Sequence, residues 1–116
     1  MLRSLERIAP VTAVEGNCDC NLCLGGTDVL ELGGLKFVLR HIFDVRFPDA
    51  EQREPLRREK PHVIVFGHTH APCFERRGDV ILVNPGYAGR QRFKLQRSIG
   101  LLLCAALGIG ANHYNL

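Results

Sequence analysis

The sequence lacks any apolar run long enough to span a membrane. Its most apolar stretch, residues 99–111, is shorter than the roughly 20 residues that a membrane-spanning helix needs, and three glycines interrupt it. The opening segment MLRSLERIAP is too polar for a secretory signal peptide, and Pro10 breaks it. We therefore expect a protein that has no membrane-spanning segment and that resides in the cytoplasm.

A concentrated basic surface is also lacking. The chain of 116 residues has 15 Lys and Arg against 12 Asp and Glu, and its net charge of +3 is small for a nucleic-acid-binding domain. Glutamates alternate with the main basic cluster, residues 53–60, and no aromatic residues lie between the arginines for bases to stack on. This pattern argues against a nucleic-acid platform and predicts a solvated helix face with ion pairs.

Disulfide bonding is not expected either, because the five cysteines are an odd number and no secretory signal accompanies them. Cys18, Cys20 and Cys23 raise the alternative of a structural zinc site completed by a histidine or by Cys73. Such sites usually combine two Cys-x-x-Cys pairs, and the sequence has no second pair. Free loop thiols are therefore the favoured interpretation.

Short apolar runs that alternate with polar segments predict one α/β domain, without internal repeats or a domain linker. We expect helices at residues 2–8 and 49–60, the second shortened or kinked by Pro55. The glycine-containing turns at residues 33–34 and 77–79 predict two β-hairpins. After Leu103 we expect an irregular tail. The expected strands are residues 11–14, 27–32, 35–41, 63–66, 73–77, 80–83 and 98–104.

The segment Gly67-His68-Thr69-His70 directly follows the strongest buried-strand signal. Ligands of open α/β sheets bind at the carboxyl ends of strands, and side chains two residues apart share a face of an extended backbone. His68 and His70 are therefore candidate metal ligands in one crevice. The alternative is a pair of surface histidines on a loop.

Two further polar blocks follow apolar runs. Gly16-Asn17-Cys18-Asp19 comes after residues 11–14, and an Asn oxygen is a suitable ligand for Mn²⁺ or Mg²⁺. The alternative for this block is a plain Gly-Asn turn. His41 ends the run 35–41 and is either a third ligand or a hydrogen-bonded residue at the edge of the core.

Taken together and in chain order, these blocks and Asn84-Pro85-Gly86 resemble the calcineurin-like metallophosphoesterase superfamily. The most similar branch is that of the small prokaryotic phosphodiesterases of the YfcE type, and the resemblance runs from Leu5 to about Leu103. It implies a partial calcineurin-like phosphoesterase α/β sandwich with the first two strands absent. Residues 1–103 would form this truncated domain, and residues 104–116 an atypical tail.

The resemblance also implies a site and a reaction. Asn17, His41 and His68 would bind one metal ion and His70 a second, with Cys18 and Asp19 in supporting positions. The family uses two divalent ions, most often Mn²⁺, to activate a water that hydrolyses a small phosphate ester. Asn84-Pro85-Gly86 would be structural.

Two blocks that such a site needs are missing from the sequence. The family begins with strands that end in Asp-x-His and Gly-Asp, and the sequence has no Asp-x-His, while its single Gly-Asp, Gly78-Asp79, belongs to an expected hairpin. At most one ion would be well held. The favoured explanation is a fragment of a phosphoesterase. The alternatives are a catalytically inactive relative that acts as a protein-interaction module, and a homo-oligomer or partner chain that covers the missing strands.

Overall fold

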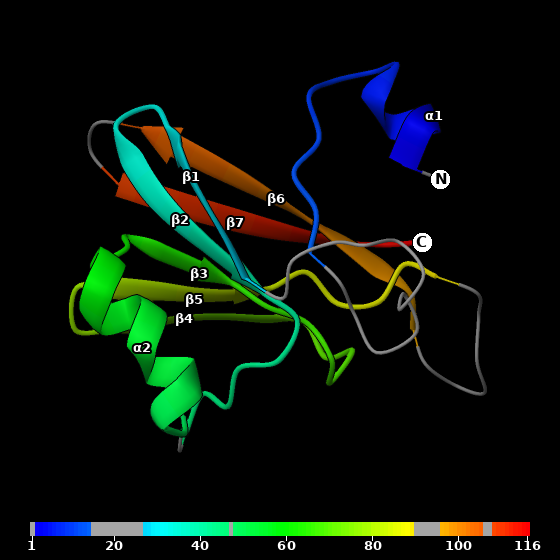
Figure 1. The fold of residues 1–116 in the computed structure, drawn as a ribbon. Helices are drawn as coiled ribbons and strands as arrows, with labels where there is room; N and C mark the ends of the chain where they lie inside the picture. Colours follow the sequence, from blue (N-terminus) through cyan, green and yellow to red (C-terminus); the bar gives the residue numbers. More distant parts are fainter. Residues whose placement is uncertain (1, 15–26, 47, 90–95, 106–107) are drawn as a thin grey trace.

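The structure, a computed structural model, describes residues 2–14, 27–46, 48–89, 96–105 and 108–116. Within these residues, no helix is long and apolar enough to cross a membrane. Two helices and seven strands are present in the described part, in the order α1, β1, β2, α2, β3, β4, β5, β6, β7 (Figure 1).

A five-stranded mixed sheet carries the fold, in the strand order β1-β2-β3-β5-β4. The three central strands are parallel, and each outer strand is the antiparallel arm of a hairpin. The two predicted hairpins are therefore confirmed. Gly33 and Gly34, with φ of 58° and 79°, both adopt the left-handed conformation that a tight two-residue turn demands. The strand bounds are Thr27–Leu32 for β1, Leu35–Arg40 for β2, Val63–Val65 for β3, Cys73–Arg77 for β4 and Val80–Asn84 for β5.

Side chains of the central strands alternate between two apolar layers, as expected for parallel strands buried on both faces. One layer contains Val38, Ile64 and Leu82, against which Leu56 of α2 packs. The other contains Phe37, Val63, Ile81 and Val83. The sheet is thus covered by α2 on one face and by a separate hairpin on the other (Figure 1).

That covering hairpin consists of β6 (Ser98–Ala105) and β7 (Gly108–Asn115), which pair antiparallel. Leu102 and Ile109 point from it into the second apolar layer. The expectation of an irregular tail after Leu103 is wrong, because all residues of β7 pair with β6. The domain boundary drawn after Leu103 stays a prediction, although β6 continues through it.

Helix α2 (Ala50–Glu59) begins and ends close to the predicted limits. Asp49 caps it by accepting a 2.8 Å hydrogen bond from the Gln52 N–H, and Lys60 ends it in the left-handed conformation with φ of 48°. The predicted shortening by Pro55 is wrong, because ten residues remain helical. Pro55 cannot donate to the carbonyl of Glu51, but Arg40 Nη1 donates to that oxygen at 3.2 Å and takes the place of the lost helical bond.

The amino-terminal segment differs from the prediction. Helix α1 (Leu2–Glu6) is shorter than expected, and residues 11–14 follow without regular secondary structure. The predicted strand at residues 11–14 is therefore wrong. An apolar run becomes a strand only when a neighbour supplies hydrogen-bond partners, and none of the strands that the structure describes pairs with this segment.

Candidate metal site

Parallel pairing of β2 and β3 brings two of the predicted ligands to one edge of the sheet. The pairing continues beyond the strands, since the Gly67 N–H donates to the His41 carbonyl at 2.9 Å. His41 thus lies directly beside the loop that carries His68. Both residues follow the carboxyl ends of their strands, where ligands of α/β sheets bind.

His41 and His68 face each other through ring nitrogens. His41 Nε2 lies 3.2 Å from His68 Nδ1, and the two rings meet edge to face with an interplanar angle of 84°. A hydrogen bond between these nitrogens requires one of them to carry a proton, whereas a shared metal ion requires both lone pairs. With metal–nitrogen distances of about 2.1 Å, two nitrogens on one tetrahedral ion lie about 3.4 Å apart. The observed separation of the two nitrogens is within a few tenths of an ångström of that distance.

The loop does not have the extended backbone that we expected. His68 has φ of 69°, and the Thr69 N–H donates to the Gly67 carbonyl at 2.9 Å, so that His68 occupies the centre of a γ-turn. His70 also has a left-handed φ of 62°. The expectation that His68 and His70 share a face through alternation is therefore wrong. His68 turns to His41, and His70 stacks on Tyr87 with ring centroids 4.3 Å apart.

Asn84, at the end of β5, holds this loop in place. Its side chain is fully buried, and its Nδ2 donates to the Gly67 carbonyl at 3.3 Å and to Thr69 Oγ1 at 3.1 Å. Its Oδ1 accepts from the Gly86 N–H at 2.9 Å. Positive φ angles are uncommon for residues other than glycine, and the buried Asn84 amide bonds to the loop on both sides of His68. The sequence indicated a structural Asn-Pro-Gly turn, but not that its first residue positions the histidine loop.

The β6–β7 hairpin in turn holds the Asn-Pro-Gly turn. Ser98 Oγ donates to the Pro85 carbonyl at 2.9 Å, and His113 Nε2 donates to the Asn84 carbonyl at 2.8 Å. Gly86 is required at its position, because a Cβ there would lie 1.9 Å from Ser98 Oγ. The hairpin that was not predicted therefore supports the loop that carries the candidate ligands.

The remaining predicted site residues, Asn17, Cys18 and Asp19, lie outside the described residues. So do Cys20 and Cys23 of the zinc alternative. Among the described residues, no group of three His, Cys, Asp or Glu side chains could hold a metal ion. His41 and His68 are therefore two donors of a site that needs others, and their role as ligands stays a prediction.

Cys73, the other candidate for the zinc alternative, lies on β4 and is half-buried. Burial, and after it the Glu75 carboxylate, raise the pKa of the Cys73 thiol, although Arg77 acts in the opposite direction. A metal ligand must be the thiolate. The protonated thiol of Cys73 is thus favoured in its surroundings.

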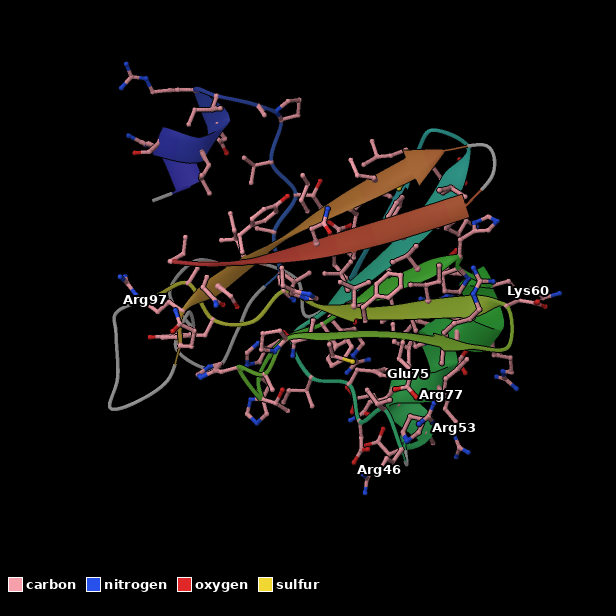
Figure 2. All side chains as sticks on the ribbon, turned by 180° about the vertical axis from the view of Figure 1, so that it is seen from behind. Arg46, Arg53, Lys60, Glu75, Arg77 and Arg97 are labelled. Carbon is pink, nitrogen blue, oxygen red and sulfur yellow. The ribbon has the colours of Figure 1, made fainter. Side chains whose placement is uncertain are left out.

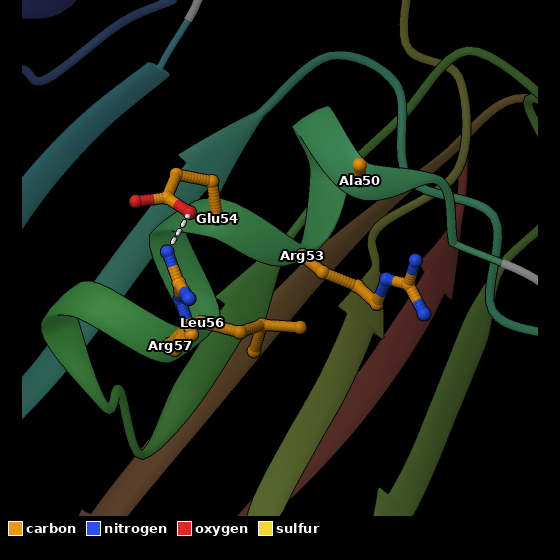
Figure 3. A pocket seen from close by; sticks show the side chains of 5 residues that line it. All are labelled: Ala50, Arg53, Glu54, Leu56 and Arg57. Atoms are coloured by element: carbon orange, nitrogen blue, oxygen red, sulfur yellow. Dashed lines mark hydrogen bonds and ion pairs between the residues drawn. The ribbon is translucent and has the colours of Figure 1, made fainter.

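Most of the charged side chains beside α2 lie in ion pairs, as predicted. Glu54 and Arg57 pair at 2.9 Å (Figure 3), and Arg77 pairs with Glu75 at 3.3 Å near the labelled Arg53 (Figure 2). A hollow of about 560 Å³ lies on this helix, and its lining residues in the described part of the chain belong to α2 and include neither His41, His68 nor His70. It offers no concentrated positive charge for a phosphate group, since Glu54 faces Arg57 within it.

Comparisons with known proteins agree on one family. The profile of the calcineurin-like phosphoesterase superfamily domain matches residues 1–106. A probable metallophosphoesterase of Methanocaldococcus jannaschii is 37% identical over 89 residues, which cover 74% of this chain and 45% of that protein. The chain therefore spans less than half the length of this relative.

Solved structures show the same fold. A phosphoesterase-like protein from Streptococcus pneumoniae superposes with a TM-score of 0.74 at 22% identity, over 88% of this chain and 60% of that one. The Vps29 protein of Chaetomium thermophilum superposes with a TM-score of 0.79 at 19% identity, over 98% of this chain and 64% of that one. Both share the arrangement of strands with this chain at low sequence identity.

Proposed function

Because the chain belongs to the calcineurin-like phosphoesterase superfamily, we propose that it contributes to a metal-dependent phosphoesterase that hydrolyses small phosphate esters, phosphodiesters among them. The observation that supports this most directly is the approach of His41 Nε2 and His68 Nδ1 to 3.2 Å at the carboxyl ends of two parallel strands. Nitrogen donors placed in this way suit a divalent ion that activates water.

In this proposal His41 and His68 hold one ion, and Asn17 is their predicted third ligand. His70 would contact a second ion, and Cys18 and Asp19 would support the Asn17 loop. Mn²⁺ is the expected metal, although this donor set also accepts other divalent ions. When bound, the metal lowers the pKa of a water molecule and neutralises charge on the phosphoryl oxygens.

The protein's own contribution is the geometry of the donors. For both facing nitrogens to bind the ion, the proton of His41 would lie on Nδ1 and that of His68 on Nε2. Asn84 fixes the γ-turn that aims His68 at His41. Since the chain spans less than half of its archaeal relative, the activity of the whole protein and its complete ligand set are part of the proposal. A site that holds at most one ion well is the expectation for the chain alone.

The test is hydrolysis of bis-p-nitrophenyl phosphate by the 116-residue chain with and without Mn²⁺, together with Mn²⁺ binding measured by electron paramagnetic resonance. His68→Ala should weaken Mn²⁺ binding at least about tenfold, as expected for the loss of one of few ligands. His62→Ala removes an exposed histidine at the opposite end of β3 and serves as the control. Equal Mn²⁺ binding by the His68→Ala and the unaltered chain would overturn the proposal.

The second candidate function is a catalytically inactive relative that binds another protein. It is favoured by an apolar row on the outer side of β6, where Ile99, Leu101 and Leu103 are exposed to 46%, 49% and 56%. Exposed rows of this kind often mark interaction surfaces. In this case a partner protein or a second copy of the chain would cover the row and shield it from solvent. The chain would then show no metal-dependent turnover.

A further inference from the structure

A pocket of about 410 Å³ opens beside His68, between the segments that follow β2 and β3. Its volume lies within the range of small-molecule sites. His68, Thr69, Asp44 and Arg46 are its polar lining residues, and six apolar side chains supply most of the wall: Ile42, Phe43, Val45, Phe66, Ala71 and Pro72. The pocket therefore joins the candidate metal ligand to an apolar chamber.

The chamber is preformed, although the segment 42–46 has no regular secondary structure. Three side chains from other elements bind its backbone. Arg40 Nε donates to the Ile42 carbonyl at 3.1 Å, Gln52 Oε1 accepts from the Asp44 N–H at 2.8 Å, and Arg77 donates to the Val45 carbonyl. Such anchoring lowers the entropy that a ligand would lose on ordering the wall.

The base of the chamber is aromatic. Phe43 and Phe66 are buried, with ring centroids 5.9 Å apart and an angle of 52° between the rings. The polar side chains of the lining are Asp44, Arg46, His68 and Thr69, and Asp44 Oδ1 already accepts from the Arg46 N–H at 2.9 Å. Over the apolar part of the wall, the hydroxyl groups of a sugar or polyol would lose water without finding partners. A flat apolar group would replace water at no such cost.

From this arrangement we infer that the pocket binds the alcohol portion of the substrate, and that the preferred substrates are phosphate esters of an aryl or similarly flat, apolar alcohol. The inference rests on the proposed function for one point, which is that the phosphate group of the substrate would lie at His41 and His68. The apolar chamber would bind its group whether or not a metal is present. Esters of polyols would bind without using the chamber.

The test uses 1-naphthyl phosphate, 1-naphthol and glycerol 2-phosphate as probes. Binding is measured by equilibrium dialysis, with naphthyl fluorescence read in the protein-free compartment, so that a tryptophan introduced by a variant does not affect the signal. We expect 1-naphthyl phosphate to bind at least tenfold more tightly than glycerol 2-phosphate, and 1-naphthol to bind in the presence of a chelator.

Two variants locate the binding. Ala71→Trp fills the exposed mouth of the pocket, and Ile42→Asp adds a charge to its wall at a residue that is itself exposed. Each should weaken naphthyl binding at least fivefold and leave Mn²⁺ binding within twofold. The matched controls are Ala88→Trp and Leu103→Asp, at exposed positions outside the pocket, and these should leave naphthyl binding unchanged.

The outcomes separate the two proposals. Naphthyl binding that Ala71→Trp and Ile42→Asp abolish, in a chain that binds no Mn²⁺, would support the chamber and overturn the proposed metal site. Mn²⁺ binding that depends on His68, without preference for the naphthyl probe over glycerol 2-phosphate, would overturn the chamber alone. Naphthyl binding that all four variants leave unchanged would also overturn it.

Discussion

Replacing Asn84 by alanine tests whether a single buried side chain holds the histidine loop. The fully buried Asn84 amide joins three partners: the Gly67 carbonyl, Thr69 Oγ1 and the Gly86 N–H. Alanine at this position removes all three hydrogen bonds. It also frees two residues, His68 and His70, from the conformation that these bonds maintain.

The three partners do not contribute equally to the expected loss. The Gly67 carbonyl keeps its bond from the Thr69 N–H, and Thr69 is exposed and can bond to water. The Gly86 N–H, which is only partly buried, loses the Oδ1 acceptor that it has in the wild type, and its cost lies toward the lower end of the about 1–3 kcal/mol of an unsatisfied buried donor. With the loss of the two weaker bonds and the small cavity, we expect Asn84→Ala to lower the free energy of unfolding by about 2–4 kcal/mol. Relaxation of the left-handed histidines would return part of this cost.

The assay is urea denaturation followed by circular dichroism, with Asn112→Ala as the control. Asn112 is exposed on β7, and its replacement should change the free energy of unfolding by less than about 0.5 kcal/mol. Below the transition, Asn84→Ala should also weaken Mn²⁺ binding, because His68 is no longer aimed at His41. A loss of stability below about 1 kcal/mol together with unchanged Mn²⁺ binding would refute the role assigned to Asn84.

Three other predictions follow from the structure. Arg40→Met should lower the free energy of unfolding by about 1–2 kcal/mol because the Glu51 and Ile42 carbonyls lose their donor. Pro55→Ala restores a helical N–H that can donate to the Glu51 carbonyl, so it should reduce this cost in a double-mutant cycle measured by urea denaturation. Gly86→Ala should cost more than about 3 kcal/mol through the clash with Ser98 and the φ of 93°, whereas Gly110→Ala, with open space around it, should cost far less in the same assay. Iodoacetamide should modify the exposed Cys104 before Cys73, whose raised pKa leaves less thiolate at a given pH, as peptide mapping would show.

The sheet could be predicted from the sequence because its signals are local. The glycines of the two turns lie within their hairpins, and all five strands formed where short apolar or β-type runs predicted them. The limits of α2 were equally local, since Asp49 and Lys60 lie next to the residues that they cap. The continuity of α2 through Pro55 could not be predicted from local sequence. The donor that replaces the missing Pro55 N–H is Arg40, which lies on β2.

The errors concern segments whose structure depends on distant partners. Residues 11–14 have an apolar composition suited to a strand but no described neighbour to pair with. Residues 108–115 are polar and glycine-rich, yet they form β7 because β6 offers a complete set of backbone partners and the sheet accepts Ile109 in its apolar layer. Composition alone could not distinguish these two segments, because hydrogen bonding to a neighbouring strand determines whether each one forms a strand.

The candidate site shows the same dependence in a stronger form. The residue types at positions 67–70 predict metal ligands, but the shape of this loop is set by Asn84, 14 residues beyond His70, and by the hairpin that holds Asn84. Ser98 and His113 donate their hydrogen bonds to backbone carbonyls of the Asn-Pro-Gly turn, so their identity reveals nothing of a metal site. A γ-turn at a histidine is stable only when such contacts outweigh its local cost. The candidate donor residues can therefore be predicted from the sequence. Their orientation depends on contacts with Asn84 and the β6–β7 hairpin, which form only in the folded chain.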